Sequence, residues 1–406
     1  MDIKKTKEPA IRFKGFTGNW EQRKLSDIAT FINGRAYKQQ ELLEFGKYPV
    51  LRVGNFGTNN QWYYSDLELD DKFYANNGDL LYTWATAFGP HIWDGKKVIY
   101  HYHIWKIELS EHLDRDYALQ LLESDKAKLL ANTNGSTMIH VTKNEMESKM
   151  VSVSSIEEQR LIGIFLKELD HLITLHQREL DLMKQQKKSL LSKMFPKNGA
   201  EFPELRFIGY TNPWEQRKLG ELMEITSLKR IHQSDWTNSG VRFLRARDIV
   251  AESKKEEVTE PLFISQEKYD EYSALSGKAK IGDLLVTGVG TIGVPMLINS
   301  EEPLYFKDGN IIWFKNEDAI DGSFFYHSFN GDSIQKFIRE STGTGTVGTY
   351  TIESGKKTPL YLPHQKEEQV KIGTFFSRLD NLITLHQRKL ETLKSIKKSF
   401  LAKMFV

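Results

Sequence analysis

A glycine-rich segment is the first place in this sequence where a ligand could bind. Gly288, Gly290 and Gly293 satisfy the spacing GxGxxG after a strand-like run, GDLLVT. This spacing is typical of loops that bind a dinucleotide or S-adenosylmethionine. The next residues, VPMLIN, include Pro295 and β-branched side chains and do not open a helix. Because no helix N-terminus is then available for a phosphate, we expect a turn between two strands.

Three histidines could bind a metal ion. His101 and His103 alternate on a predicted strand, and His91 lies upstream. Imidazole is a common metal ligand, but the segment has no cysteine and no evident carboxylate partner to complete a site. We expect no metal here and interpret the histidines as polar side chains on a recognition surface.

Motifs for catalysis are not found. Asn212-Pro213-Trp214 is similar to the Asn-Pro-Pro-aromatic motif of adenine methyltransferases, but one proline is missing, and a second copy of the segment reads Gly18-Asn19-Trp20. Neither GxxxxGKS nor GxxxxGKT, the motifs of ATP-driven motors, occurs. The paired acids and lysine of a metal-dependent nuclease are not evident either. We expect no catalytic residue in this chain and no cofactor bound by it.

Other side chains could read DNA. Basic, amide, hydroxyl and aromatic residues in short loops are the groups that contact phosphates and base edges. The candidates are Arg35, Lys38, Arg52, Asn55, Trp84, Thr86, Lys229, Arg230, Arg245, Arg247, Asp248, Thr287 and Thr291. Each could instead be an ordinary solvated surface residue. Arg245, Arg247 and Asp248 are favoured because LRARD interleaves apolar and charged positions. The segments NGST at Asn134 and STGTGTVGT at Ser341 could be DNA-facing loops or hairpin connections.

These candidate residues lie in a sequence that contains two internal repeats. Pro9–Leu25 returns as Pro203–Leu219, with the hexapeptide WEQRKL identical in both copies. A second repeat begins at Glu157 and again at Glu367, where 24 of 39 aligned positions are identical. Between the repeats only short echoes remain, LRVGN against LRARD and GDLLYT against GDLLVT. A repeated framework with different contents is expected of two recognition surfaces on one scaffold.

The second repeat predicts two long helices. Neither copy contains proline, and apolar residues recur at alternating spacings of four and three, the pattern of a coiled-coil seam. The seam is assigned to Ile162, Leu166, Leu169, Ile173, His176, Leu180, Ile372, Phe376, Leu379, Ile383, His386 and Leu390. We interpret His176 and His386 as polar residues that set helix register rather than as catalytic groups. Ser155–Glu158 fits a capping box for the first helix.

The short connections between segments set the topology. The first helix runs almost directly into the second globular part, which runs almost directly into the second helix. We therefore expect an α/β (α+β) fold with an antiparallel coiled coil and pseudo-twofold symmetry, in which the chain ends near its start. The predicted domains are recognition domain 1 (1–153), a first spacer helix (154–198), recognition domain 2 (199–362) and a second spacer helix (363–406).

Composition limits the class of protein. With 406 residues, 39% of them hydrophobic, the chain is long enough for two packed domains. It has no apolar run that could span a membrane and starts with the charged MDIKKTKEPA, so neither a membrane span nor a signal peptide is expected. The absence of cysteine fits the cytoplasm. The net charge is only +2, so a surface for DNA must be local.

The order and duplication of WEQRKL, GDLL and LITLHQR resemble the specificity subunits of type I restriction–modification systems, and the WEQRKL wording resembles staphylococcal members in particular. The resemblance implies two target recognition domains that each read one half of a bipartite site on double-stranded DNA, with the helices fixing the gap. It also implies two methylation subunits and two restriction subunits as partners. Those partners would bring S-adenosylmethionine, ATP and Mg, and the helices and WEQRKL elements would form the docking scaffold.

Two other classes of protein remain. A stand-alone DNA-modifying enzyme would need the cofactor loop and acids that the sequence lacks. A structural coiled-coil scaffold would explain the helices but not two large, divergent globular parts.

Overall fold

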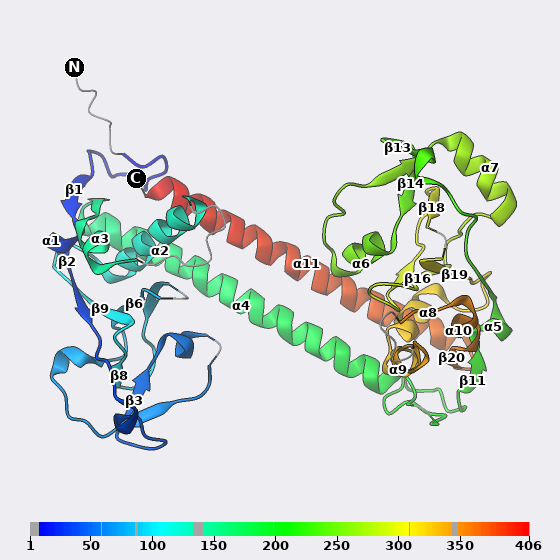
Figure 1. The fold of residues 1–406 in the computed structure, drawn as a ribbon, viewed down its shortest axis with the longest axis horizontal. Helices are drawn as coiled ribbons and strands as arrows, with labels where there is room; N and C mark the ends of the chain where they lie inside the picture. Colours follow the sequence, from blue (N-terminus) through cyan, green and yellow to red (C-terminus); the bar gives the residue numbers. More distant parts are fainter. Residues whose placement is uncertain are drawn as a thin grey trace. The chain divides into compact units, whose positions relative to one another are not determined.

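A computed structural model describes residues 8–57, 59–85, 88–132, 141–197, 199–307, 309–342 and 348–405. The chain forms two compact units (Figure 1). Unit 1 comprises residues 1–177 and 388–406, and unit 2 comprises residues 178–387. Each unit therefore contains one globular part together with portions of both long helices. Among the described residues, no helix is long and apolar enough to cross a membrane.

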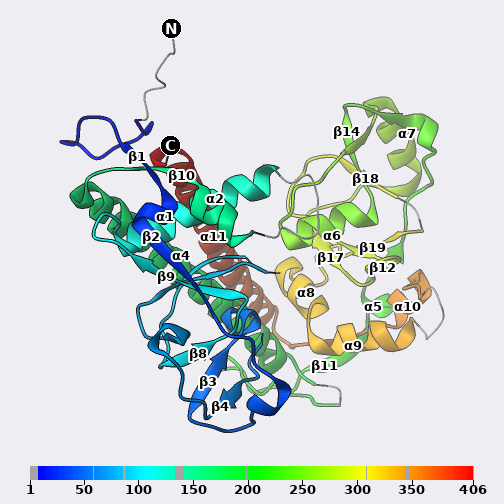
Figure 2. The same cartoon turned by 60° about the vertical axis from the view of Figure 1, so that its left-hand side comes forward.

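Unit 1 is built on two four-stranded sheets and a two-stranded ribbon. The strand orders are β2-β9-β6-β7, β4-β3-β8-β5 and β1-β10, and Figure 2 shows β3, β4 and β8 together. The strands are β1 (Glu21–Lys24), β2 (Ala29–Asn33), β3 (Tyr48–Leu51), β4 (Tyr63–Ser65), β5 (Tyr74–Ala75), β6 (Leu80–Thr83), β7 (Gly89–Ile92), β8 (Val98–Tyr100), β9 (Ile104–Leu109) and β10 (Met150–Val153). The helices are α1 (Leu25–Ile28), α2 (Arg115–Asn132) and α3 (Lys143–Ser148), with short 3-10 turns η1 (Gln39–Glu41), η2 (Val53–Phe56) and η3 (Asp71–Phe73).

Unit 2 repeats this plan. Its sheets have the orders β12-β19-β16-β17, β13-β15-β14-β18 and β11-β20. The strands are β11 (Glu215–Lys218), β12 (Glu224–Thr226), β13 (Trp236–Thr237), β14 (Val241–Leu244), β15 (Leu262–Ile264), β16 (Leu284–Thr287), β17 (Pro295–Leu297), β18 (Leu304–Phe306), β19 (Ile311–Lys315) and β20 (Pro359–Leu362). The helices are α5 (Leu219–Leu222), α6 (Ala246–Lys254), α7 (Gln266–Ser276), α8 (Gly322–Phe329), α9 (Asp332–Ser341) and α10 (Ile352–Lys357), with the turn η4 (Gln233–Asp235). The fold is thus mixed helix and strand with two repeated domains, as predicted.

The long helices are α4 (Ile156–Met194) and α11 (Lys366–Met404). In unit 1, Phe165 near the start of α4 packs against Phe400 near the end of α11, with ring centroids 4.9 Å apart. In unit 2, Phe195, directly after α4, packs against Phe376 near the start of α11 at 6.0 Å. Early residues of one helix meet late residues of the other in both units, so the helices are antiparallel, as the connection lengths predicted.

Each unit packs its first sheet against a helix and against the ends of the long helices. In unit 1 the core joins Tyr82 and Trp105 of the sheet to Tyr117 of α2 and to Phe405 after α11. In unit 2 the core is equivalent and includes Phe324 of α8 and Phe195 after α4. The backbone N–H of Ile11 donates to the carbonyl of Lys403 at 3.2 Å. The end of α11 therefore lies against the N-terminal segment of unit 1, as expected.

The start of α4 differs in one detail from the predicted capping box. The Ser155 hydroxyl accepts the backbone N–H of Glu158 at 3.4 Å. The Glu158 carboxylate does not complete the box, because it binds both Nε and Nη2 of Arg12, at 2.7 and 2.9 Å. A long-range ion pair has replaced the local contact.

Candidate nucleic-acid interface

One end of the first sheet in unit 1 gathers several candidate residues. The register pairs Asn33 of β2 with Trp105 of β9, and Thr83 of β6 with Ile104 of β9. The end of β2, the end of β6 and the start of β9 therefore lie together at one end of this sheet, where the strands stop, and we call this end the sheet edge. Arg35 follows β2, Trp84 follows β6, and the segment 101–103 precedes β9. Thr86 and the NGST segment lie outside the described residues.

Arg35 is held in place at this edge. Its guanidinium binds the Glu41 carboxylate at 2.8 and 3.2 Å, and Lys38 donates its backbone N–H to the same carboxylate at 2.8 Å. The hydrogen bonds from Arg35, and to a smaller extent that from Lys38, hold the pKa of Glu41 below its usual range. The Lys38 side chain is exposed. Arg35 is thus positioned by its neighbours, and Lys38 presents its ammonium to solvent.

The histidines do not alternate on a strand, contrary to the prediction. β8 ends at Tyr100, His101 forms an isolated bridge with Arg35, and residues 102 and 103 form the turn into β9. His91 lies on β7, where its ring stacks on Phe56 at 4.1 Å and burial lowers its pKa to about 4. Among the described residues, these three histidines belong to no group of His, Asp and Glu close enough to hold a metal. The strand was misassigned because the segment VIYHYHIW is continuously apolar or aromatic and hides the turn within it.

The corresponding edge of unit 2 gathers the second set. Thr226 of β12 pairs with Trp313 of β19, and Thr287 of β16 pairs with Ile311. Lys229 and Arg230 follow β12, and both side chains are exposed. The segment 288–294 follows β16, and the segment 307–310 precedes β19, with residue 308 outside the described residues. Both units therefore place candidate residues at the same end of the same sheet.

The glycine-rich segment is a turn between antiparallel strands, as expected. β16 and β17 pair antiparallel, and the buried Thr287 hydroxyl closes the turn by donating to the Thr291 carbonyl and accepting the backbone N–H of Val294 at 3.0 Å. Gly290 and Gly293 have φ of 71° and 77°, in the left-handed region that favours glycine. Thr287 thus stabilises the turn, while Thr291 is exposed at its tip.

Arg52 with Asn55 and Arg245 with Asp248 form equivalent caps. The Asn55 side chain accepts the Arg52 backbone N–H at 3.0 Å, and Asp248 accepts that of Arg245 at 2.9 Å. Asp248 is buried and also binds the Arg245 guanidinium through Nε and Nη2, at 3.0 and 2.9 Å. The guanidinium of Arg52 lies over the Tyr63 ring at 4.3 Å. All four residues take part in these local caps, and their predicted role in DNA binding stays a prediction.

Arg247 is the most accessible member of the LRARD segment. Its side chain is 56% exposed, and its nearest carboxylate oxygens, on Glu260 and Asp248, lie at 3.6 and 3.9 Å. Such loose, exposed ion pairs exchange readily for a phosphate. Of the three favoured residues, Arg247 is best placed to meet DNA. The segment Ser341–Thr349 is described only at its two ends, with residues 343–347 outside the described part.

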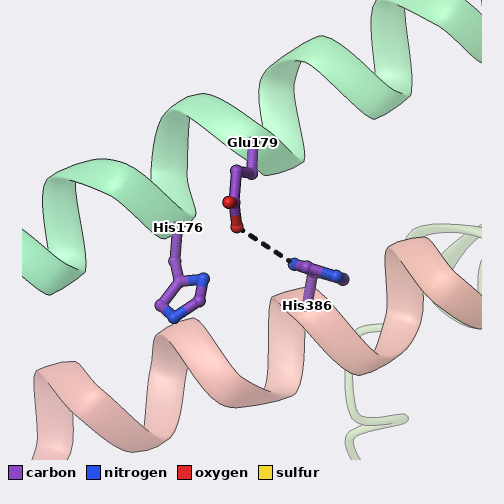
Figure 3. Close-up of side chains that lie close together, drawn as sticks. All are labelled: His176, Glu179 and His386. Carbon is purple, nitrogen blue, oxygen red and sulfur yellow. Dashed lines mark ion pairs between the residues drawn. The ribbon is translucent and has the colours of Figure 1, made fainter.

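The helix residues assigned to the seam are all buried or half-buried. In unit 1 these are Ile162, Leu166, Leu169, Ile173, His176 and Leu390, and in unit 2 they are Leu180, Ile372, Phe376, Leu379, Ile383 and His386. His386 Nδ1 lies 3.6 Å from a carboxylate oxygen of Glu179 (Figure 3). The contact joins α11 to α4 within unit 2 and fits a polar position that sets register.

Sequence reasoning missed the partners of Lys187 and Lys397, which occupy equivalent positions of the two long helices. Lys187 binds Asp380 at 2.6 Å in unit 2, and Lys397 binds Asp170 in unit 1. Asp380 also lies 3.8 Å from the buried His327, whereas Asp170 accepts a hydrogen bond from Gln120 at 2.9 Å. A signal was present, because both aspartates lie at equivalent positions of the repeat.

A second ion pair, between an arginine and a glutamate, is repeated in the two units. Arg206 binds Glu368 through Nε and Nη2 at 2.7 and 2.9 Å, as Arg12 binds Glu158. The two carboxylate side chains are 1% and 0% exposed. Each pair ties the segment before the WEQRKL strand to the first turn of a long helix. The repeats in sequence are therefore repeats of the same contacts.

Comparison with known proteins decides the family. The type I restriction modification DNA specificity domain matches residues 17–185 and again 211–395. The chain belongs to the type I restriction–modification specificity family. It is 26% identical to the MjaVIII specificity subunit of Methanocaldococcus jannaschii, over 94% of this chain and 91% of that protein. It is 30% identical to the putative specificity subunit S.HindORF215P of Haemophilus influenzae, over 41% of each.

The fold of the family is also present in solved structures. The S subunit of a type I restriction-modification system from M. genitalium superposes with a TM-score of 0.60 at 16% identity, covering 98% of this chain and 99% of that one. At this identity the likeness concerns the fold. Both matched regions of the specificity family include one sheet edge described above, Arg35 to His103 in the first and Lys229 to Asn310 in the second.

Proposed function

We propose that this chain is the sequence-specific DNA-binding subunit of a type I restriction–modification complex, in which each unit reads one half of a bipartite target. The observation that carries the proposal is the double match to the specificity domain, once in each half of the chain. The two sheet edges add support. They occupy equivalent places in the two units but present different side chains, as two readers of an asymmetric site should.

The long helices are proposed to set the gap between the half-sites. They repeat the same antiparallel contacts and the same half-buried lysine–aspartate pairs, so their register is fixed in each unit. The proposed partners are double-stranded DNA, two methylation subunits and two restriction subunits. The chain itself is proposed to be non-catalytic, with S-adenosylmethionine, ATP and Mg bound by the partners, and the complex is proposed to act in the cytoplasm. The two WEQRKL strands support closer kinship with staphylococcal members.

The test is to co-express the chain with its methylation subunit and to map methylated adenines across a genome by single-molecule sequencing. The expected result is a two-part motif with a fixed gap. A soluble, associated complex that methylates no bipartite motif would contradict the proposal.

A further inference from the structure

The turn before β9 in unit 1 is rigidly held. The backbone N–H of Tyr102 donates to the carbonyl of Arg35 at 3.1 Å, and the indole N–H of Trp84 donates to the carbonyl of Tyr102 at 2.9 Å. The backbone N–H of Trp84 donates to the carbonyl of His103 at 3.2 Å. Tyr102 therefore has a fixed backbone, and a contact made by its side chain costs little further ordering.

An exposed aromatic ring stands on this turn. The Tyr102 side chain belongs to the large hydrophobic side chains that remain exposed, at 39%. Its ring lies beside Trp84, with centroids 6.2 Å apart, and Trp84 in turn contacts His103 at 4.8 Å and Trp105 at 6.1 Å. We call Trp84, His101, Tyr102 and His103 the aromatic edge. It connects the exposed Tyr102 ring, through the tilted contact with Trp84, to Trp105 of the core, on which Trp84 stacks.

The aromatic edge offers rings rather than charge. Burial, the neighbouring His103 and Arg52 lower the pKa of His101 to about 4, so its imidazole is uncharged at neutral pH. The nearby Arg35 guanidinium is bound to Glu41. The Trp84 indole N–H is already used by the Tyr102 carbonyl. The Tyr102 ring therefore stands beside an imidazole that carries no charge and near a guanidinium that already has a carboxylate partner.

Unit 2 lacks this feature at the equivalent place. The turn before β19 contains Lys307, Gly309 and Asn310, and the residue after β16 is Gly288 where unit 1 has Trp84. A side chain at Gly288 would approach the Tyr350 carbonyl to 2.7 Å, so no aromatic ring fits there. The two edges therefore differ in chemistry, not only in sequence.

We propose that Tyr102 is a specificity-determining residue of unit 1, and that its ring contacts the 5-methyl group of a thymine in one half-site. The thymine methyl is the apolar feature of the major groove, and an exposed, preorganised ring matches it better than it matches a hydrogen-bonding base edge. This inference rests on the proposed function. It assigns an A·T pair to the half-site that unit 1 reads.

The first experiment compares methylation motifs of the full complex carrying wild-type chain, Tyr102→Ala or Tyr102→Phe. Tyr102→Ala should relax one position of one half-site and leave the other half unchanged, while Tyr102→Phe keeps the ring and should retain the motif. Phe45→Ala, which removes an exposed ring elsewhere in unit 1, should change neither half. The position relaxed by Tyr102→Ala identifies the proposed thymine.

The second experiment replaces that thymine by uracil in a synthetic duplex, which removes only the methyl group. The wild-type complex should methylate the uracil duplex about fourfold more slowly, from the value of one buried methyl group. Tyr102→Ala should lose roughly 5- to 160-fold in discrimination at this position, and its methylation rate should not change when uracil replaces the thymine. Tyr102→Gln, with the same measurements, replaces Tyr102→Ala if the latter complex does not assemble, because it also removes the apolar ring.

The outcomes separate the two proposals. If the wild-type complex yields no bipartite motif, the proposed function fails, and this inference fails with it. If the wild type yields a motif but Tyr102→Ala leaves it intact, changes both halves equally, or keeps the full uracil effect, only the inference is overturned. A relaxed position that is not an A·T pair has the same meaning.

Discussion

Replacing the buried Glu368 tests whether each of the repeated ion pairs stabilises the unit in which it lies. Glu368→Gln removes the charge that two N–H groups of Arg206 bind at 2.7 and 2.9 Å, at a carboxylate that is 1% exposed. The Arg206 side chain is itself only 12% exposed, so water cannot easily replace the lost partner. Breaking such a pair leaves an uncompensated charge and costs about 3–5 kcal/mol.

A matched control is available in the same unit. Glu340 pairs with Lys336 at 3.8 Å on the surface of α9, and the two side chains are 65% and 55% exposed. Glu340→Gln removes the same charge by the same change. Because exposed pairs contribute little, this variant should lower the free energy of unfolding by less than about 0.5 kcal/mol.

The assay is urea unfolding of the purified chain, or of its complex with the methylation subunit, followed by tryptophan fluorescence. Trp214 packs against Phe195 and Phe324 in the core that the ion pair borders, so its share of the emission changes when unit 2 unfolds. An equal, small effect of Glu368→Gln and Glu340→Gln would refute the argument. It would mean that the Arg206 guanidinium finds other acceptors or water.

Three further predictions follow from other contacts. Burial, and to a smaller extent the charge of Lys187, lower the pKa of His327 to about 3 in the folded chain. In the unfolded chain a histidine has a pKa of about 6.5. Between about pH 6.5 and about pH 3 the unfolded chain therefore binds a proton that the folded chain does not. Unit 2 should lose stability over that window, and His327→Gln should flatten urea midpoints measured from about pH 7 to about pH 4; an unchanged slope would show that another group titrates. Gly373→Ala would place a Cβ 2.7 Å from the backbone N of Phe324, so it should cost about 1–3 kcal/mol by thermal unfolding despite the better helix propensity of alanine; a stabilised variant would contradict this packing. Arg247→Ala should weaken or relax recognition of one half-site only in methylation mapping, and equal loss at both halves would exclude two separate readers.

The family and the scaffold could be predicted from the sequence because they are written in regular patterns. The duplication of WEQRKL and of LITLHQR predicted two equivalent units, and the spacing of Ile162, Leu166 and Leu169 predicted a buried helix face. A helical period follows from local geometry alone. The short connections then left only an antiparallel arrangement of the helices.

The candidate site was only partly accessible in this way. The sequence favoured Arg245, Arg247 and Asp248 alike as readers of DNA. The structure separates them, because Arg245 and Asp248 bind each other in a cap while Arg247 is exposed. It interpreted His101 and His103 as strand residues and did not single out Tyr102. Composition reveals that a side chain can bind, but not whether a neighbour has already bound it.

What the sequence by itself determined is the repeated framework, because periodic apolar residues dictate helices and strands without reference to distant parts of the chain. What only the tertiary structure decided is which polar side chains remain available at each sheet edge. That depends on strand register, which brings Arg35, Trp84 and Tyr102 together in unit 1, and on partners from other loops, such as the Tyr102 carbonyl that accepts the Trp84 indole N–H. Register and partners are set by the packing of segments far apart in the chain, and no local pattern encodes them.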